Sequence, residues 1–542
     1  MSYDAIVIGA GVNSLVAAWR LAAAGLRVLV LERRETEGGS LVTEEIAPGF
    51  RVDTARHDIG WIPPVVARAL AVRGVALVRP DPEIVAPLAD GGALLLSPDV
   101  AQAAAAIQQH SPRDAERWPE FARLTARLAG FLESLYGAPP PRVPGAGFSD
   151  LVALGRLALR LRRLGKADMV ELLRTVPMPV ADLLDDWFET DALKGAVGAA
   201  GIKGILQGPR SGGTAFLLLH HLVGGRGVVV RGGVGALSTA LAALAKEAGA
   251  ELRTGVEVQG ITLQGGRATG VATMAGEEIA ARVVLSGADP RATLLGLVHP
   301  IHLDPEFVRA ARHIRCRGAV AKVNLALDRL PVFRGVPDEA LAGAITIAPT
   351  LAYLERAYDH AKHGRVSERP FLEVRIPSVL DASLAPQGKH VASIWVQYVP
   401  YQGKGEGGRG KGETGEREAG SGKRGGSAEV DVGEIVMRVL EDYAPGIGRL
   451  VLHRQVLTPN DLEARVGLTE GSLYHGELGL DQVLFMRPLG RWARYRTPIA
   501  GLYLCGAGSH PGGGTIGASG WLAARVVLSD EKRGRQPVEA DR

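Results

Sequence analysis

Residues 4–32 carry the pattern that most constrains this chain: an apolar run, a glycine turn, an alanine- and leucine-rich stretch, and a second apolar run. The first run, residues 5–8, is uninterrupted, as in a parallel strand covered on both faces. Residues 12–24 have helical composition and precede Gly25, where a helix C-cap falls. The second run ends at the acidic Glu32. This order predicts a βαβ unit and an α/β fold built on a parallel sheet.

The glycine turn reads GAGVNS, so Gly9 and Gly11 occupy the first two positions of a GxGxxG motif and Ser14 occupies the third. The first glycine permits the tight turn, and the second lets a pyrophosphate reach the helix N-terminus. Serine is a small residue that the third position can tolerate, at some cost in helix–strand spacing. Glu32 stands where an acid accepts hydrogen bonds from the adenosine ribose hydroxyls. Together these features predict a dinucleotide site rather than an ordinary glycine turn.

A second glycine pair, Gly38 and Gly39, follows Glu32 and Arg33. NAD binding does not need this pair, and here the chain resembles flavoproteins in which a second glycine turn runs beside the FAD pyrophosphate. It is most similar to the phytoene desaturase-type FAD-dependent oxidoreductases, and among them to the branch called pyridine nucleotide-disulfide oxidoreductase domain-containing protein 2. The resembling stretches are GGSLVTEEIAPGF, CRGAVAKVNLALDRLP, HRQVLTPNDLEARVGLTEGSLYHGELGLDQ and GLYLCGAGSHPGGGTIGASG.

The resemblance implies the remaining FAD contacts. Gly38 and Gly39 would line the pyrophosphate, Val258 would present backbone groups to adenine, and Gly506 would approach the ribityl chain. Residues of a C-terminal loop would lie against the isoalloxazine ring: Gly513, Gly514, Thr515, Ile516 and Gly517. A helix beginning near Ile516 would direct its N-terminal dipole at that ring. Ser40 departs from the family pattern, because many desaturases carry arginine there.

Lys322 and His510 are the candidate catalytic residues. Lys322 lies in the middle of an apolar strand, in a pattern that resembles amine oxidases, whose lysine holds a water at flavin N5. The alternative is a lysine at a sheet edge or lobe interface. His510 either acts at the flavin edge as an acid, base or orienting group, or braces the glycine loop. His57 and Asp58 either contact substrate or form a structural ion pair, and no metal site is predicted.

The domain organisation follows from these motifs. We predict a Rossmann-like FAD-binding domain with an inserted α+β substrate lobe. The FAD-binding domain comprises residues 1–64, 224–290 and 501–528, and the lobe comprises residues 65–223, which are mainly helical, 291–401 and 428–500. Residues 402–427 are nearly devoid of apolar side chains and are predicted to be a disordered insertion, and residues 529–542 to be a flexible tail.

Two absences narrow the chemistry. The glycine cluster at residues 232–235 is not followed by an acid-terminated strand, so it is interpreted as part of the FAD domain rather than an NADPH site. The two cysteines, Cys316 and Cys505, form no CxxC motif, which argues against a disulfide reductase. The electron acceptor is then oxygen, a quinone or a substrate.

Composition limits the partners. The net charge is only +4 and basic residues are not interleaved with aromatics, so nucleic acid is not an expected partner. No signal peptide or apolar run of transmembrane length is found, which predicts a cytoplasmic protein. Residues 151–166 carry five basic side chains among leucines. They either contact an anionic membrane peripherally or form a solvated helix over the lobe.

These features predict an FAD-dependent oxidoreductase, a monomer or homodimer. Its reaction would be dehydrogenation, desaturation or saturation at C–H or C=C bonds of an apolar small molecule. Two alternatives remain open. One is an amine oxidase-like flavoenzyme. The other is a flavin-binding regulatory or escort protein with little turnover, because the Rab GDP-dissociation inhibitors resemble this fold.

Overall fold

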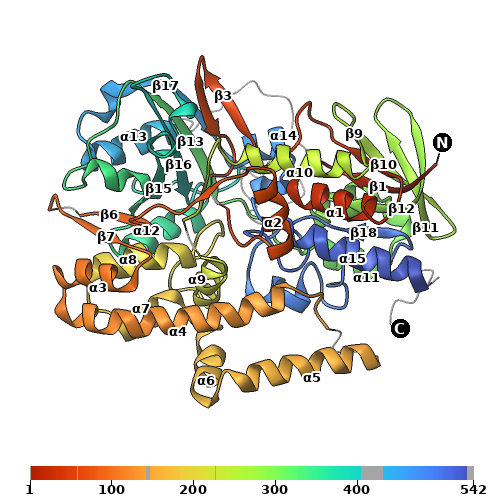
Figure 1. Cartoon of the computed structure of the whole chain (residues 1–542), viewed down its shortest axis with the longest axis horizontal. Coiled ribbons are helices and arrows are strands. Elements are labelled where there is room, and N and C mark those ends of the chain that lie inside the picture. Colours follow the sequence, from red (N-terminus) through yellow and green to blue (C-terminus); the bar gives the residue numbers. More distant parts are fainter. Residues whose placement is uncertain are drawn as a thin grey trace, which may run out of the picture.

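The computed structural model describes residues 2–57, 59–88, 90–141, 147–225, 227–403 and 431–533. Parallel strands form the sheet that the N-terminal pattern predicts. In it, β1 (Tyr3–Ile8) lies between β2 (Val28–Leu31) and β12 (Glu278–Ser286). β9 (Glu251–Arg253) extends the sheet beyond β2, and β18 (Leu502–Leu504) extends it beyond β12. The sheet therefore joins strands from three distant parts of the chain, at the right of Figure 1.

Helices cover one face of this sheet with small and branched apolar side chains. They are α1 (Val12–Ala22), α10 (Gly235–Glu247) and α15 (Ala518–Arg533), and they share one buried core with β1 and β2. On the edge beside β12, β10 (Val258–Gln264) and β11 (Arg267–Thr273) add an antiparallel meander. The turn between β10 and β11 falls at Gly265 and Gly266, where both residues have positive φ.

The glycine cluster before α10 is hydrogen-bonded to Thr43 of β3 (Thr43–Ala47) and Asp53 of β4 (Phe50–Asp53), which form a separate two-stranded sheet. Val234 N donates to Asp53 Oδ1 at 2.9 Å, and Gly235 N donates to Thr43 Oγ1 at 2.9 Å. Because side chains already satisfy these amides, they are not free to bind a phosphate. The prediction that residues 232–235 are not an NADPH site agrees with this geometry.

A second, mostly antiparallel sheet forms the lobe at the left of Figure 1. Its strands are, in spatial order, β17 (Val451–Leu457), β13 (Val320–Leu327), β16 (His390–Gln397), β15 (Phe371–Arg375), β14 (Ala344–Ile347), β6 (Ile84–Pro87) and β7 (Ala93–Leu96). β13 is buried along its whole length, because α13 (Val432–Tyr443) packs on one face of the sheet. Residues 65–223 are thus not wholly helical, since they supply β6 and β7.

The helical layer of the lobe lies below this sheet in Figure 1. It comprises α3 (Val100–Gln108), α4 (Pro112–Tyr136), α5 (Phe148–Arg163), α6 (Lys166–Thr175), α7 (Val180–Trp187), α8 (Asp191–Gly198) and α9 (Thr214–Leu222). The remaining elements are β3 (Thr43–Ala47), β4 (Phe50–Asp53), α2 (Pro64–Val72), β5 (Leu77–Val78), β8 (Val229–Val230), α11 (Pro305–Arg312), α12 (Leu351–Lys362) and α14 (Pro459–Val466). No described helix has both the length and the apolar character needed to cross a bilayer.

The last helix differs from its predicted bounds at both ends. It begins at Ala518 rather than near Ile516, and it continues to Arg533 instead of ending at Leu528. The extension is stabilised by Asp530, which accepts hydrogen bonds from Arg496 and from Tyr503. Residues 404–427 of the predicted insertion and 534–542 of the predicted tail lie outside the described residues.

Candidate active site

A cavity of about 260 Å³, here called the nucleotide cavity, opens at the carboxyl ends of β1, β2, β12 and β18. Ligands of open α/β sheets bind at this edge, because loops and helix N-termini converge there. Nearly all of the predicted cofactor residues line it: Gly9, Gly11, Ser14, Glu32, Arg33, Gly38, Gly39, Val258, Gly506, Gly513, Thr515 and Ile516. Of the other two, Gly514 lines a second cavity, and Gly517 packs against Val16 of α1.

The first glycine turn is open toward the nucleotide cavity. Gly9 has φ +85°, which only glycine adopts at low cost, and its N–H donates to Leu31 O at 2.7 Å. Gly11 is the N-cap of α1, and no side chain caps that helix. A Cβ atom built on Gly9 or Gly11 meets no protein atom within 4 Å. The turn therefore leaves room for an anion at a helix N-terminus with unsatisfied amides.

Ser14 is accommodated at the third motif position by a glycine on the opposite strand. Its side chain is buried, and its Oγ lies 4.0 Å from Cys505 Sγ. A Cβ on Gly287, just after β12, would lie only 1.9 Å from Ser14 Oγ. The small residue that usually lies on the helix thus lies on the strand, so the close helix–sheet packing is retained.

Glu32 is held at the end of β2 by two backbone amides. Ala10 N donates to Oε2 at 2.7 Å, and Arg34 N donates to Oε1 at 3.0 Å. A carboxylate has about four acceptor positions, so capacity remains for the hydroxyls of a ribose. The second glycine turn lies beside the first, because Gly38 N donates to Ala10 O at 2.9 Å and a Cβ on Gly39 would be 3.2 Å from the Gly11 Cα atom.

The nucleotide cavity also contains polar groups that the motifs did not identify. Asn13 Oδ1 and His475 Nδ1 are buried and have no hydrogen-bond partner among the described residues, and both residues line the cavity, as does Arg56. Burial lowers the pKa of His475, whose φ is +56°. Arg487 fixes this loop by donating to Tyr474 O and Gly476 O. Unpaired buried polar atoms of this kind favour a polar occupant such as FAD.

His475 could have been found from the sequence. It lies in one of the stretches with the most specific family resemblance, HRQVLTPNDLEARVGLTEGSLYHGELGLDQ, but the predicted site residues include none from that stretch. Arg56 could not be found in this way, because no motif with a stated mechanism surrounds it.

The C-terminal glycine loop joins the N-terminal segment at the far end of the nucleotide cavity. Ile516 N donates to Trp61 O at 2.8 Å, and Thr515 Oγ1 donates to Gly512 O at 2.8 Å. Gly60 packs so closely on this loop that a Cβ there would be 1.6 Å from Gly514 O. These contacts place Gly513, Thr515 and Ile516 on the nucleotide cavity and Gly514 on the opposite side.

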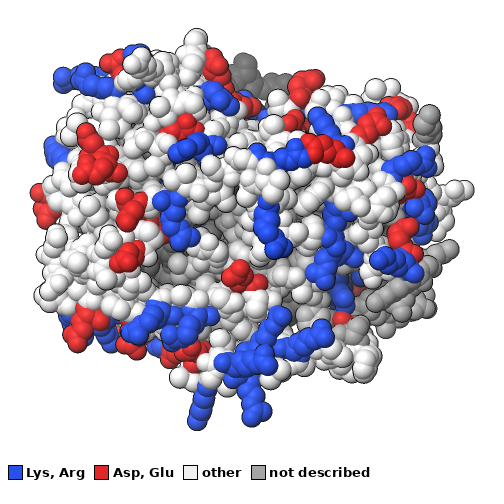
Figure 2. Space-filling view, in the orientation of Figure 1, with Lys and Arg blue, Asp and Glu red and all other residues white. Residues whose placement is uncertain are grey.

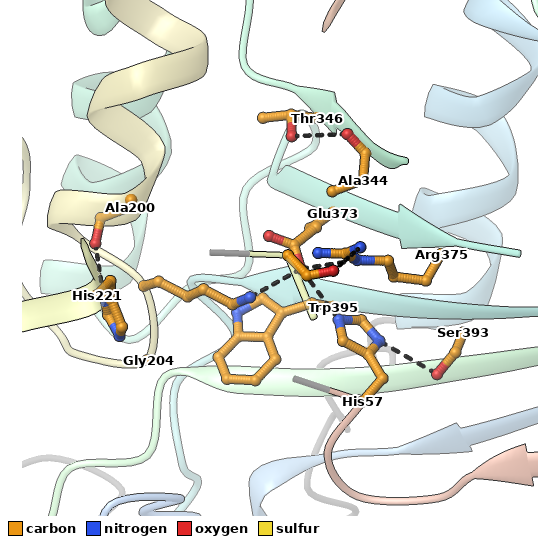
Figure 3. Close-up of polar contacts among 12 residues, drawn as sticks. His57, Ala200, Gly204, His221, Ala344, Thr346, Glu373, Arg375, Ser393 and Trp395 are labelled. Atoms are coloured by element: carbon orange, nitrogen blue, oxygen red, sulfur yellow. Dashed lines mark hydrogen bonds and ion pairs between the residues drawn. The ribbon is translucent and has the colours of Figure 1, made fainter. Parts of the chain in front are cut away.

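A second cavity of about 90 Å³, here called the inner chamber, lies against Gly514 and Gly60. Lys203, Glu373 and Arg375 line it from the lobe. Glu373 and Arg375 are two residues apart on β15 and therefore project from the same face of the sheet. Figure 3 shows both side chains directed toward His57 and Trp395.

Glu373 is the centre of a buried hydrogen-bonded chain. Its Oε1 accepts from Lys203 Nζ at 2.7 Å and from His57 Nε2 at 3.1 Å. Burial alone would raise the pKa of Glu373, but the Lys203 charge and the His57 hydrogen bond outweigh it and hold that pKa well below its usual range. Burial, reinforced by the Lys322 charge, lowers the pKa of His57 to about 3. At neutral pH the chain thus contains an ionised carboxylate and an uncharged imidazole.

The structure places Lys322 behind this chain rather than on the surface of either cavity. It is fully buried in β13, and its Nζ donates to Ser393 Oγ at 2.6 Å and lies 2.7 Å from His57 Nδ1. It lies on an inner strand rather than at a sheet edge, and it lines neither the nucleotide cavity nor the inner chamber. Its contact with His57 of the N-terminal segment places it at the interface of the lobe, which is the other half of the structural alternative. His57 is the residue that links it to the inner chamber. Asp58, its neighbour, lies outside the described residues.

His510 is packed inside the protein beside α4. Its Nε2 donates to Leu135 O at 3.2 Å, its carbonyl accepts from Tyr495, and its side chain is 1% exposed. Burial lowers its pKa to about 4. This geometry matches the alternative in which the histidine braces the glycine loop. A different histidine, His220, donates to Gly513 O at 2.8 Å and so contacts that loop directly.

A third cavity of about 510 Å³, here called the vestibule, adjoins the inner chamber at Glu83, Ile84 and Gly225. Most of its surface is apolar and comes from β7, α3, α4, α8 and α9: Leu96, Val100, Trp118, Phe121, Ala126, Val197 and Leu222. The vestibule and the inner chamber together extend from the helical layer to the C-terminal glycine loop.

A dinucleotide cavity on a parallel sheet, beside a chamber under a separate lobe, is the arrangement expected of a flavin-dependent oxidoreductase. The sequence profile of the flavin containing amine oxidoreductase family matches residues 15–367. That match spans more than half of the chain, and the chain belongs to this family. FAD is therefore its cofactor, and it is an FAD-dependent oxidoreductase of phytoene dehydrogenase-like type.

Individual relatives agree. The chain is 36% identical to pyridine nucleotide-disulfide oxidoreductase domain-containing protein 2 of Rattus norvegicus, over 98% of this chain and 94% of that protein. It is 27% identical to the lycopene-forming phytoene desaturase of Pantoea ananas, over 96% and 98%. Putrescine oxidase bound to putrescine has the same fold, with a TM-score of 0.61 and 15% identity over 98% and 100%. The predicted resemblance and the Rossmann-like fold are thus confirmed.

Proposed function

We propose that this oxidoreductase removes hydrogen from a C–H bond of an apolar small molecule, or saturates a double bond in the reverse direction. The observation that carries the proposal is the apolar vestibule, which adjoins the inner chamber beside Gly514. Bound FAD supplies the hydride acceptor or donor. The chain itself must hold the reacting carbon beside the glycine loop and keep bulk water away.

The lining residues suit these two tasks. Trp118 and Leu222 offer partly exposed apolar surfaces to the body of a substrate, so binding there would be stabilised by burial of apolar area. Ile59 and Gly60 lie next to Gly514, and the close Gly60–Gly514 contact leaves no space for solvent between the two segments.

Anaerobic mixing of the purified flavoprotein with hydrophobic donors, including polyenes and cyclic monoterpenes, tests this proposal. We expect loss of flavin absorbance near 450 nm, the general signature of flavin reduction, with at least one donor. A Leu222→Ala variant should raise KM for that donor about tenfold with a smaller change in kcat, since it removes apolar contact far from the chemistry. Failure of every hydrophobic donor to reduce a normally loaded flavin would contradict the proposal.

The amine oxidase alternative depends on Lys322 reaching the flavin. Its Nζ is engaged with Ser393 and His57, and this arrangement gives that alternative no specific support. Release of hydrogen peroxide on addition of amines would favour it over hydrocarbon oxidation.

We also propose that α5 and α6 contact an anionic lipid surface. Phe148, Leu151 and Leu159 of α5 are 84%, 58% and 47% exposed. They lie on the outer side of the helix, whereas Leu157 and Leu161 are half-buried. Exposed cations lie beside or within this apolar stripe: Arg156, Arg160, Arg162, Arg163 and Lys166. Figure 2 shows lysine and arginine side chains gathered over these helices at the lower edge of the molecule. Exposed apolar groups bordered by cations are typical of helices that lie in a membrane interface.

A further inference from the structure

Glu373 presents one carboxylate oxygen to the inner chamber. Lys203, His57 and Arg375 all contact its other oxygen, Oε1. Among the described residues, none donates a hydrogen bond to Oε2. That oxygen is not enclosed by protein either, so it is accessible from the chamber that Glu373 lines. Each oxygen of a carboxylate has about two acceptor positions, which leaves Oε2 able to accept a proton.

The contacts of Oε1 keep this carboxylate ionised and fixed in place. Burial raises the pKa of Glu373, but the charges of Lys203 and Arg375 and the His57 hydrogen bond outweigh it and hold that pKa well below its usual range. His57 is oriented in turn by Lys322, because an ammonium group can only donate. The 2.7 Å contact of Lys322 with Nδ1 therefore places the imidazole proton on Nε2, toward Glu373. At neutral pH the chamber thus contains an anionic proton acceptor in one defined position.

Two other groups of the chamber could accept a proton, and both are less suited. Glu83 is partly exposed and also lines the vestibule, whereas Glu373 is only 9% exposed. His221 Nδ1 donates to Ala200 O at 2.8 Å, so the basic nitrogen of this imidazole is Nε2. That nitrogen already lies 3.2 Å from the Tyr474 hydroxyl. Of the described groups that line the chamber, Glu373 is therefore the buried one that is best placed to take a proton from a ligand.

We propose that Glu373 is the base of a dehydrogenation, and that its Oε2 accepts the proton that the substrate loses when a neighbouring carbon gives up a hydride. The first C–H bond breaks with its electron pair passing to bound FAD, which is thereby reduced. The second C–H bond breaks with its proton passing to Glu373, and its electron pair forms the C=C bond. The substrate is oxidised, and the products are an alkene, reduced FAD and a protonated Glu373.

This role rests on the proposed function and selects one of its two directions. An ionised carboxylate is ready to accept a proton, so the resting state of the chamber suits removal of hydrogen. Saturation of a double bond would require Glu373 to carry a proton, which Lys203 and Arg375 oppose at neutral pH. A carbon beside a centre that has lost a hydride is strongly acidic, so a positioned carboxylate of low pKa is a sufficient base.

Anaerobic stopped-flow measurements separate the limiting rate of FAD reduction from the dissociation constant of the donor. For a donor that reduces the unmodified protein, Glu373→Gln should lower the limiting rate about a hundredfold or more and change the dissociation constant less than about threefold, because the proton has no acceptor. Glu373→Asp should retain part of the rate. Glu368→Gln, at an exposed position just before β15, is the matched control and should reduce normally. An unchanged limiting rate in Glu373→Gln would overturn the proposal.

The pH dependence of the limiting rate distinguishes a base from a structural carboxylate, and it needs no variant of Glu373. Several described groups face Glu373 or the same chamber: Lys203, Arg375, His57, Glu83 and His221. In the unmodified protein the rate should stay constant from about pH 8 to about pH 5, because the carboxylate remains ionised there. Lys203→Met should raise the pH at which the rate falls by about one unit or more, whereas Lys203→Arg, which keeps the charge, should change it little. The same pH in both variants would contradict the proposal.

Infrared titration separates failure of this inference from failure of the proposed function. The carboxyl band that Glu373→Gln removes, or that Glu373→Asp shifts, reports the protonation of Glu373 in the FAD-loaded protein without any donor. A Glu373 that is protonated at neutral pH would overturn the inference, whether or not hydrophobic donors reduce the flavin. Normal flavin reduction in Glu373→Gln would overturn the inference and leave the proposed function intact. If no hydrophobic donor reduces the flavin of the unmodified protein, the proposed function fails, and the inference fails with it.

Discussion

Glu32 illustrates how a single buried carboxylate can serve both the fold and the cofactor. Its oxygens accept from Ala10 N and Arg34 N, which fixes the glycine turn against the end of β2. The same oxygens face the nucleotide cavity. Both partners are backbone amides that need only an acceptor oxygen. A glutamine at this position has the same shape and can keep part of these hydrogen bonds, but it lacks the negative charge that would accept from the ribose.

We therefore expect Glu32→Gln to fold but to bind FAD about tenfold to a hundredfold more weakly, as for the loss of a charged hydrogen bond of 1.5–3 kcal/mol. The dissociation constant is measured by titrating FAD into the protein after the flavin has been released. Glu278→Gln, at an exposed position of β12, is the control and should bind FAD normally. Unchanged affinity in Glu32→Gln would show that this carboxylate does not contact the ribose.

Residues near one another in the sequence were predictable, and residues brought together by the lobe were not. Gly9, Gly11, Glu32 and Gly39 follow from motif spacing, because the turn, helix and strand that position them are local. The Lys203–Glu373–His57 chain has no such signature, since its members lie 170 and 316 positions apart. Lys322 stands out in the sequence as a lysine within an apolar strand, but its partners come from β16 and from the loop after β4, so they could not be inferred.

Among the elements, α5 shows most clearly what packing adds to a sequence pattern. From sequence alone its basic residues do not fall on one clean face. The structure shows which side is turned inward, because Leu161 packs with α4 and α6 in one apolar cluster. With that side known, the outward face proves to be apolar at Phe148 and Leu159, with arginines on both sides of it.

This arrangement predicts salt-sensitive binding to anionic vesicles. The triple variant Arg156→Gln, Arg160→Gln and Arg163→Gln should lose most binding to phosphatidylglycerol vesicles, because each cation near such a surface contributes about 1 kcal/mol. Cosedimentation measures the bound fraction. Arg113→Gln, on α4, is a single-site control that should bind like the unmodified protein. The membrane proposal would be contradicted if the triple variant bound these vesicles as well as the unmodified protein does. It would also be contradicted if the unmodified protein bound neutral phosphatidylcholine vesicles as well as anionic ones.

At the scale of the whole molecule, buried neutral histidines couple stability to pH. The pKa is lowered by burial to about 3 for His57 and to about 4 for His220 and His510. An unfolded histidine has a pKa of about 6.5. Between that pH and the lowered native pKa values, the unfolded chain therefore binds more protons than the folded protein. The free energy of unfolding has its full value above pH 6.5. It decreases as the pH falls toward 4, by up to about 1.4 kcal/mol per pH unit for each of these histidines.

We expect the free energy of unfolding, measured by denaturant titration, to fall between pH 6.5 and 5. His510→Asn should flatten this pH dependence, even though it destabilises the protein at neutral pH, because one imidazole no longer has to lose its proton on folding. The exposed His453→Asn should leave the slope unchanged. If the free energy of unfolding of His510→Asn changed with pH as steeply as that of the unmodified protein, His510 would not be kept neutral in the native state.

The position of β18 at residues 502–504 has a consequence for biosynthesis. Its partner, the 284–286 end of β12, is translated long before it, so that edge of the sheet stays unpaired while the intervening residues are made. At 5–20 residues per second this wait is roughly 10–40 s. Throughout it the nascent chain exposes an apolar strand edge, and the glycine loop at 512–517 does not yet exist. We therefore expect FAD capture to follow synthesis of this loop, and chaperones that shield strand edges to raise the yield of FAD-loaded protein.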